Sequence, residues 1–151
     1  MSFAIVVSRW NDAFTSKLES GAVEALKSSG VGDESIDVFH VPGAFELPLA
    51  CLTAAGTNLY DAVIALGVVI RGDTPHFDYV AGQAAAGLMQ ASMQTEVPVM
   101  FGVITADNIE QVETRSGEKA DNKGWEAAVS AVEMANTMRE IALRRERDIE
   151  F

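Results

Sequence analysis

Four short hydrophobic runs rich in β-branched residues recur along the chain, and longer segments of a different pattern separate them. The runs cover residues 3–8, 35–41, 62–70 and 97–105. Three of them are nearly continuous in apolar residues, which is typical of parallel strands covered on both faces. We therefore expect four strands in a parallel sheet with helices on both sides.

The segments between these runs show the three-to-four-residue spacing of amphipathic helices. The clearest series follows the third run: Phe77, Val80, Ala81, Ala84, Leu88 and Ala91. Strands and helices then alternate along the chain, and crossovers between parallel strands are almost always right-handed. This order predicts an α/β fold, a three-layer α/β/α sandwich of flavodoxin-like type with a four-stranded parallel sheet.

A long final helix is expected to begin near Lys123. It carries two adjacent apolar stripes, the first with Trp125, Ala128, Val129, Val132 and Ala135, and the second with Met134, Met138 and Ile141. One interpretation is a well-buried terminal helix, and the other is that the second stripe contacts another subunit. Small residues at positions 82–87 allow close helix packing, so we expect a homo-oligomer.

Length and composition indicate a globular protein of one domain over residues 1–151. The chain has 151 residues, which is close to the usual domain size of about 150, and it contains no Gly/Ser linker or internal repeat. Acidic residues outnumber basic ones 22 to 11, giving a formal net charge of -11. This sign argues against nucleic-acid binding, which requires neutralisation of phosphates.

The sequence predicts a cytoplasmic protein that binds no membrane. The longest apolar run, residues 62–70, is about half of what a membrane span requires. The N-terminus lacks the basic residues that precede a signal-peptide core. The single cysteine, Cys51, cannot form an internal disulfide, and its place in an apolar helical segment predicts a buried, inert thiol.

Candidate site residues follow the predicted strands, because ligands of parallel α/β sheets bind beyond the carboxyl ends of the strands. These segments are residues 9–11, 42–46, 71–76 and 106–108. They bring aromatic, acidic and titratable side chains to one rim. An aromatic face with a carboxylate suits a planar, hydroxylated ligand. The alternative is that Trp10, Phe45 and Phe101 are core residues and that Glu46 complements a helix dipole.

The segment from Arg71 to His76 resembles a helix N-terminus, where free backbone N–H groups favour an anion such as phosphate. The alternative is an ordinary turn capped by Asp73 or Thr74. His76 is suited to proton transfer near neutral pH, or it is simply a partly exposed residue at a helix start, whereas His40 lies within a strand and is interpreted as structural.

Arg115 also has two interpretations. It ends a predicted helical segment, so it can complement the helix C-terminus, or its planar guanidinium can bind phosphate in a bidentate manner. The chain has no GxGxxG, Walker A or HExxH motif and no carboxylate–histidine spacing typical of a metal site. The sequence therefore disfavours a metal or nucleotide enzyme, and we expect no metal.

The string VIRGDTPHFDYV at residues 69–80 resembles the signature of the 6,7-dimethyl-8-ribityllumazine synthase family of riboflavin biosynthesis. Further segments match in the family's order: Trp10-Asn11, residues 43–48, residues 98–105, Glu110-Gln111, Arg115, Gly117 and residues 122–124. The resemblance runs from about residue 3 to residue 136. It implies a transferase that condenses 5-amino-6-(D-ribitylamino)uracil with 3,4-dihydroxy-2-butanone 4-phosphate and releases phosphate and water, with no cofactor.

The resemblance also implies roles for individual residues. His76 would be catalytic, moving protons. The pyrimidine and ribityl chain would contact Trp10, Ala44, Phe45, Glu46, Val68, Val69, Ile70 and Phe101. The phosphate would be bound by Gly72, Asp73, Thr74 and Arg115, with Lys123 as an additional candidate. Trp10 stands where phenylalanine is commoner in the family, and Asp73 where small residues are frequent.

The family's site lies between subunits of a pentamer, so the resemblance implies a homopentamer with small-molecule substrates and riboflavin synthase as a functional partner. The chain begins almost at its first core strand, so we expect the N-terminal strand that many members donate to a neighbour to be missing, which favours a free pentamer. The short connection at residues 117–123 resembles members that form sixty-subunit capsids. Rival interpretations are a non-catalytic flavin-binding or regulatory module and a cage-forming protein.

Overall fold

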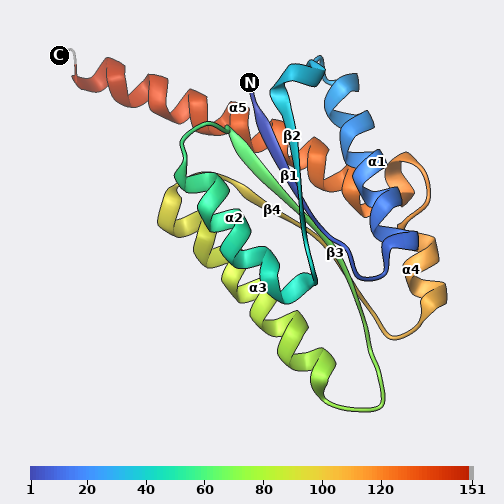
Figure 1. Ribbon diagram of the computed structural model, residues 1–151. Coiled ribbons are helices and arrows are strands. Elements are labelled where there is room, and N and C mark those ends of the chain that lie inside the picture. The colour runs from blue at the N-terminus through green and yellow to red at the C-terminus, as the bar shows by residue number, and fades with distance from the viewer. Residues whose placement is uncertain (150–151) are drawn as a thin grey trace.

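A parallel four-stranded sheet in the order β2-β1-β3-β4 forms the middle of the molecule (Figure 1). The computed structural model describes residues 1–149. The strands are β1 (Phe3–Ser8), β2 (Ile36–Val41), β3 (Ala62–Ile70) and β4 (Val99–Ala106). The expected bounds of β1 and β3 are confirmed. β2 begins one residue later than expected, because Ser35 ends a short 3-10 turn, η1 (Asp33–Ser35), and β4 begins and ends later, at Val99 and Ala106.

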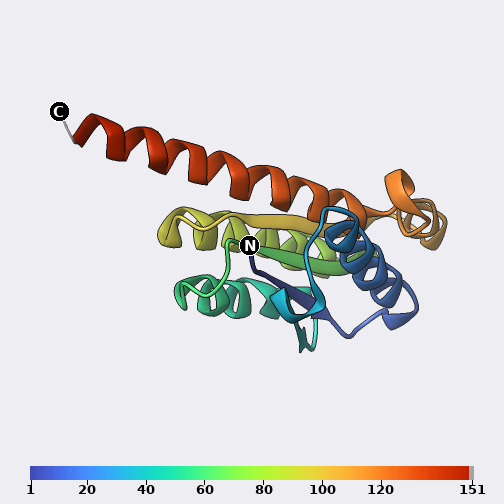
Figure 2. The same ribbon diagram turned by 90° about the horizontal axis from the view of Figure 1, so that it is seen from above.

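Helices cover both faces of the sheet, which confirms the predicted three layers (Figure 2). One layer contains α1 (Asp12–Ser28), α4 (Ile109–Arg115) and α5 (Lys123–Ile149). The other contains α2 (Leu47–Gly56) and α3 (His76–Thr95). Two further 3-10 turns, η2 (Ala44–Glu46) and η3 (Lys119–Asp121), precede α2 and α5. No helix within residues 1–149 is long and apolar enough to cross a membrane.

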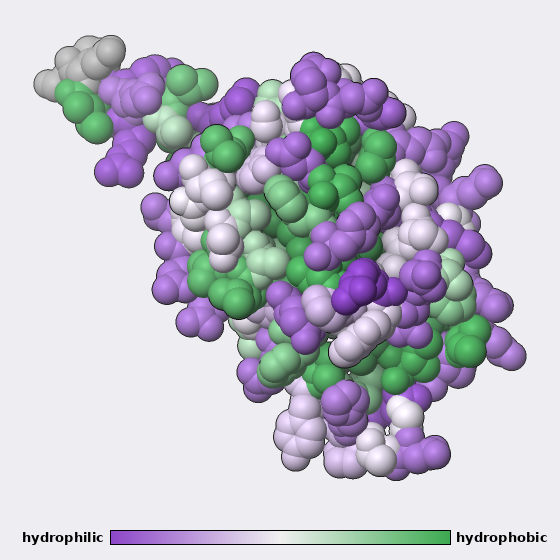
Figure 3. Space-filling model, in the orientation of Figure 1, coloured by the Kyte–Doolittle hydropathy of each residue, from purple (hydrophilic) through white to green (hydrophobic). Residues whose placement is uncertain are grey.

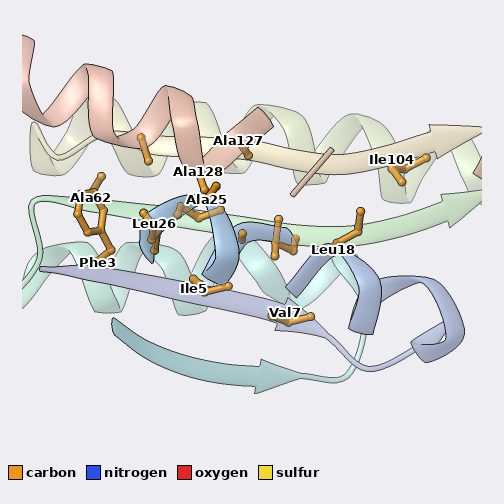
Figure 4. Packing of buried hydrophobic residues seen from close by; sticks show 14 of the residues in the cluster. Phe3, Ile5, Val7, Leu18, Ala25, Leu26, Ala62, Ile104, Ala127 and Ala128 are labelled. Carbon is orange, nitrogen blue, oxygen red and sulfur yellow. The ribbon is translucent and has the colours of Figure 1, made fainter. Parts of the chain in front are cut away.

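The core consists of two hydrophobic clusters, one on each face of the sheet. All residues of β1 are buried, as are those of β3 apart from its last, which explains their continuous apolar runs. Figure 4 shows the cluster beneath α1 and α5, where Leu18, Leu26 and Ala128 meet Phe3 and Ile5. β2 lies at the edge of the sheet and has no buried residue, so it is the least apolar strand.

The long helix α5 buries only part of its apolar surface. Ala128 and Ala135 of the first stripe are buried, but Val129, which was expected to share that buried face, is 44% exposed. In the second stripe Met134 and Ile141 are also exposed. The helix extends well past the end of the sheet, as Figures 1 and 2 show. The single chain therefore leaves the second stripe without a core to cover it.

Large hydrophobic side chains are also exposed on the opposite layer. Leu49 on α2 and Met89 and Met93 on α3 are each more than 60% exposed. Figure 3 shows hydrophobic residues gathered over the middle of the face that carries α2 and β2. Contiguous apolar surface of this kind is typical of a protein–protein contact.

Candidate functional site

A hollow of about 610 Å³, here called the Trp10 hollow, opens where β1 and β3 end. The structure brings together eight predicted site residues on its walls: Trp10, Ala44, Phe45, Glu46, Val68, Val69, Ile70 and His76. They come from four separate segments of the chain. The parallel arrangement of the sheet brings these segments to one rim, as expected for a ligand site in this kind of fold.

Backbone hydrogen bonds to the end of the edge strand β2 position Trp10. β1 ends at Ser8, and the next backbone N–H groups continue to bond toward β2: Arg9 donates to Val41 at 2.8 Å and Trp10 donates to Pro42 at 3.0 Å. Trp10 is 62% exposed, so it is not the core residue of the alternative interpretation. Its flat aromatic surface is available for stacking on a planar ligand.

Asn11 lines the same hollow, although no role for it was predicted from the sequence. Its backbone is in the left-handed region, with φ 65°, a conformation that asparagine tolerates better than most residues. The side-chain Nδ2 donates to the carbonyl of Val68 at 3.3 Å. This bond ties the start of α1 to β3, so Asn11 helps to hold the rim together.

Phe45 and Glu46 lie on η2, the short turn that leads into α2. Phe45 is 59% exposed, so it too is available to a ligand and is not core. The Oε2 atom of Glu46 accepts the backbone N–H of Gly43 at 3.2 Å, the same contact that the third residue of a capping box makes. Glu46 therefore has a structural role in the turn, and its carboxylate is still part of the wall of the Trp10 hollow.

The loop between β3 and α3 is exposed from Arg71 to His76. α3 begins at His76 with Pro75 as its N-cap, so the expectation that Asp73 or Thr74 caps this helix was wrong. Thr74 instead accepts the N–H of His76 on its hydroxyl at 3.4 Å. Within the described residues, the backbone N–H groups of Gly72, Asp73 and Thr74 bond to no acceptor, so they are free to bind an anion.

A second hollow of about 380 Å³, here called the Arg115 hollow, lies along the edge strand β4. Its walls include Phe101, Arg115 and Lys123. Phe101 is 39% exposed and so is not a core residue. Nη1 of Arg115 donates to the carbonyl of Gln111 at 3.0 Å, as expected of an arginine that complements a helix C-terminus, yet the side chain also lines the hollow. Both interpretations of Arg115 are thus compatible with its position.

Asn122 fixes the loop that carries the residues of the Arg115 hollow. It is 2% exposed, and its Nδ2 donates to the carbonyls of Lys17 at 3.0 Å and Gly117 at 2.9 Å. Its Oδ1 accepts the N–H of Trp125 at 3.0 Å, which caps the start of α5. One buried amide therefore joins α1, the loop and α5, and holds Arg115 and Lys123 on the same side.

The Trp10 hollow and the Arg115 hollow share no lining residue. The structure thus brings His76 together with the aromatic and carboxylate residues, but places Phe101, Arg115 and Lys123 in a separate hollow. Sequence order gave no sign of this division. Among residues 1–149, no group of three or more His, Cys, Asp or Glu side chains is arranged to hold a metal ion.

His40 lies on β2, as expected, and not in the Trp10 hollow. Its Nε2 lies 2.8 Å from Oε1 of Glu19 on α1, which agrees with a structural role.

A family model described as 6,7-dimethyl-8-ribityllumazine synthase matches residues 1–139. This match covers most of the chain, including both hollows, and the chain belongs to the 6,7-dimethyl-8-ribityllumazine synthase family.

Proposed function

We propose that this chain is an active lumazine synthase. It condenses 5-amino-6-(D-ribitylamino)uracil with 3,4-dihydroxy-2-butanone 4-phosphate and releases phosphate and water, without a cofactor. The observation that carries the proposal is the Trp10 hollow, where an exposed indole, a carboxylate and an imidazole from distant segments line one cavity. Family membership supports small-molecule substrates for this cavity.

The pyrimidine substrate would occupy the Trp10 hollow. Trp10 stacks on its ring, and the apolar side chains of Val68, Val69 and Ile70 form the wall beneath it. Ala44, Phe45 and Glu46 contact the ribityl chain, whose hydroxyls need polar partners in an otherwise apolar cavity. This arrangement supports recognition of a ligand with a flat ring at one end and hydroxyls at the other.

The phosphate of the second substrate would bind the free N–H groups of Gly72, Asp73 and Thr74. The Asp73 carboxylate is exposed, so the backbone can bind the anion while this side chain faces solvent. Arg115 is the cationic partner, since its planar guanidinium suits bidentate phosphate binding. Lys123 lines the hollow of Arg115 and is a further cation there.

His76 would be the catalytic residue. It stands at the first position of α3, next to residues 72–75, here called the phosphate loop, and on the wall of the Trp10 hollow. It moves protons during imine formation, phosphate elimination and ring closure. General acid–base catalysis of this kind contributes about 10²–10⁴ in rate. Holding both substrates in register supplies much of the remainder.

Two separate hollows support a site shared between neighbouring subunits. One chain would supply Trp10, Glu46 and His76, and its neighbour would supply Phe101, Arg115 and Lys123. The exposed hydrophobic residues of α2, α3 and α5 provide contact surface for such neighbours. We propose a homopentamer of single-domain subunits as the functional unit. Assembly of such pentamers into a larger capsid is compatible with the same contacts.

The test mixes the purified protein with both substrates and follows lumazine absorbance and phosphate release. Wild-type protein should form lumazine, and an Arg115→Ala variant should form far less. An Arg144→Ala variant should match the wild type, because Arg144 lies on the exposed end of α5 and, among residues 1–149, its ion pair is with Glu140. No product above the uncatalysed background, from folded and oligomeric protein, would contradict the enzyme and favour a flavin-binding or cage-forming protein.

A further inference from the structure

Arg71 lies at the junction between β3 and the phosphate loop, and its half-exposed side chain contacts three partners. Its Nε donates to Oδ1 of Asp107 at 2.9 Å, and its Nη1 lies 3.4 Å from Oδ1 of Asp78. The guanidinium carbon is 4.4 Å from the centre of the Phe77 ring. Its own backbone N–H donates to Ala106 at 2.8 Å. Arg71 thus joins the end of β4 to the first turn of α3.

The charge of Arg71 is already paired. The hydrogen bond that Arg71 donates to Asp107 and the negative charges of Asp78 and Asp107 together raise the pKa of Arg71, so the guanidinium is cationic at any ordinary pH. A planar fork between two carboxylates and an aromatic face uses the geometry that distinguishes arginine from lysine. Each ion pair is about half exposed, so their combined effect is on geometry more than on stability.

The loop between these anchors is weakly held by its own contacts. Residues 72–75 are exposed, and a Cβ placed on Gly72 would meet nothing within 4 Å. In the described part of the chain, the loop's local hydrogen bonds are the one from the His76 N–H to Thr74 and the one from the Asp78 N–H to Pro75 at 3.0 Å. The position of the loop relative to the sheet therefore depends on how its two ends are joined.

We propose that Arg71 is a positioning residue that joins the start of α3 to the end of β4 and thereby holds the phosphate loop and His76 in place. It is not itself the phosphate ligand, because its charge is already paired with Asp78 and Asp107 and the guanidinium packs on the Phe77 ring. This inference rests on the proposed function, since it concerns the site that would bind the butanone phosphate. Of Arg71 and Arg115, only Arg115 would then contact the phosphate as a cation.

Asp107→Asn separates the two roles by the sign of its effect. If Arg71 positions the loop, removing its carboxylate partner loosens the loop, and the KM for the butanone phosphate rises about 3- to 10-fold. If Arg71 binds phosphate, the same change frees the guanidinium, and this KM falls. Asp33→Asn is the matched control, because Asp33 pairs with Lys27 just before the start of β2, whereas Arg71 and Asp107 follow the carboxyl ends of β3 and β4, and its loss removes the same charge.

A readout without substrate keeps this proposal separate from the proposed function. In Arg71→Gln, the hydrogen-bonded amides of His76 and Asp78, which join the loop to the first turn of α3, should exchange faster, while the amides of β3 keep their wild-type protection. Unchanged exchange at His76 and Asp78, or a lower KM in Asp107→Asn, would overturn the positioning role. If the wild-type protein made no lumazine, the proposed function would fail, and the exchange measurement would still test the contact made by Arg71.

Discussion

The indole of Trp10 lies directly against the backbone of Gly43. A Cβ at position 43 would overlap Cε3 and lie 2.6 Å from Cζ3 of the indole. Gly43 has φ -137° and ψ -179°, an extended conformation that any residue adopts, so the glycine is needed for close approach and not for backbone freedom. The absence of a side chain at position 43 therefore sets where the stacking surface of Trp10 lies.

Gly43→Ala should displace the Trp10 ring without unfolding the protein. Loss of the stacking contact is worth about 1 kcal/mol, so the KM for the pyrimidine substrate should rise about 5-fold. The measurement is steady-state kinetics of Gly43→Ala, Trp10→Ala and the double variant. The double variant should resemble Trp10→Ala alone. Full additivity of the two changes would contradict the proposed link between Gly43 and Trp10.

The division of the site residues between two hollows predicts complementation between inactive subunits. His76→Asn and Arg115→Ala should each have little activity alone. After co-expression in equal amounts, about a quarter of shared sites would combine an intact His76 with an intact Arg115 from the neighbour. Lumazine formation by the purified mixed oligomer should recover accordingly.

The control for complementation pairs His76→Asn with Trp10→Ala, because both residues line the same hollow of one chain. In that mixture no site regains both residues, so activity should not exceed that of the Trp10→Ala sites. Equal recovery in both mixtures would argue that the site is not divided between neighbours as proposed.

Burial raises the pKa of the Cys51 thiol from 9.0 to about 12. In the unfolded chain the thiol ionises above pH 9, so above this pH the unfolded state binds fewer protons than the folded state. The free energy of unfolding should therefore fall by about 1.4 kcal/mol per pH unit between pH 9 and pH 12 from this group. Urea titrations at pH 8 and pH 10 should show a smaller loss in Cys51→Ala than in the wild type, and an identical loss would contradict this effect.

Gly124 allows α5 to cross α1 at very close range. A Cβ at this position would overlap the backbone of Leu18, whose carbonyl carbon would be 2.7 Å away. Because backbone cannot rotate aside as a side chain can, Gly124→Ala should lower the free energy of unfolding by about 3 kcal/mol. Gly56→Ala is the matched control, since a Cβ at that position would meet no other part of the chain within 4 Å. Urea unfolding should show no comparable loss for the control, and equal effects of the two changes would contradict the role of close approach.

The sequence determined the elements and the rim on which the candidate site lies. Continuous apolar runs identified β1 and β3 because both faces of these central strands are covered. The helical spacing after Phe77 and the start of α5 at Lys123 were predicted correctly for the same reason, since burial of one face imposes a period on the chain. Alternation of strands and helices then placed Trp10, Glu46 and His76 at the carboxyl ends of parallel strands.

Only the tertiary structure determined which strands and which side chains are neighbours. The strand order β2-β1-β3-β4 places β4 at an edge, so Phe101 is exposed along that edge and lies in a different hollow from His76. The contact between Arg71 and Asp107 joins residues 36 apart in the chain, and no local sequence pattern predicts it. Periodicity indicates which face of a helix or strand is buried, but it does not indicate which other element packs against that face. Those neighbours are chosen by packing between distant segments, which is why the division of the site became visible only in the folded chain.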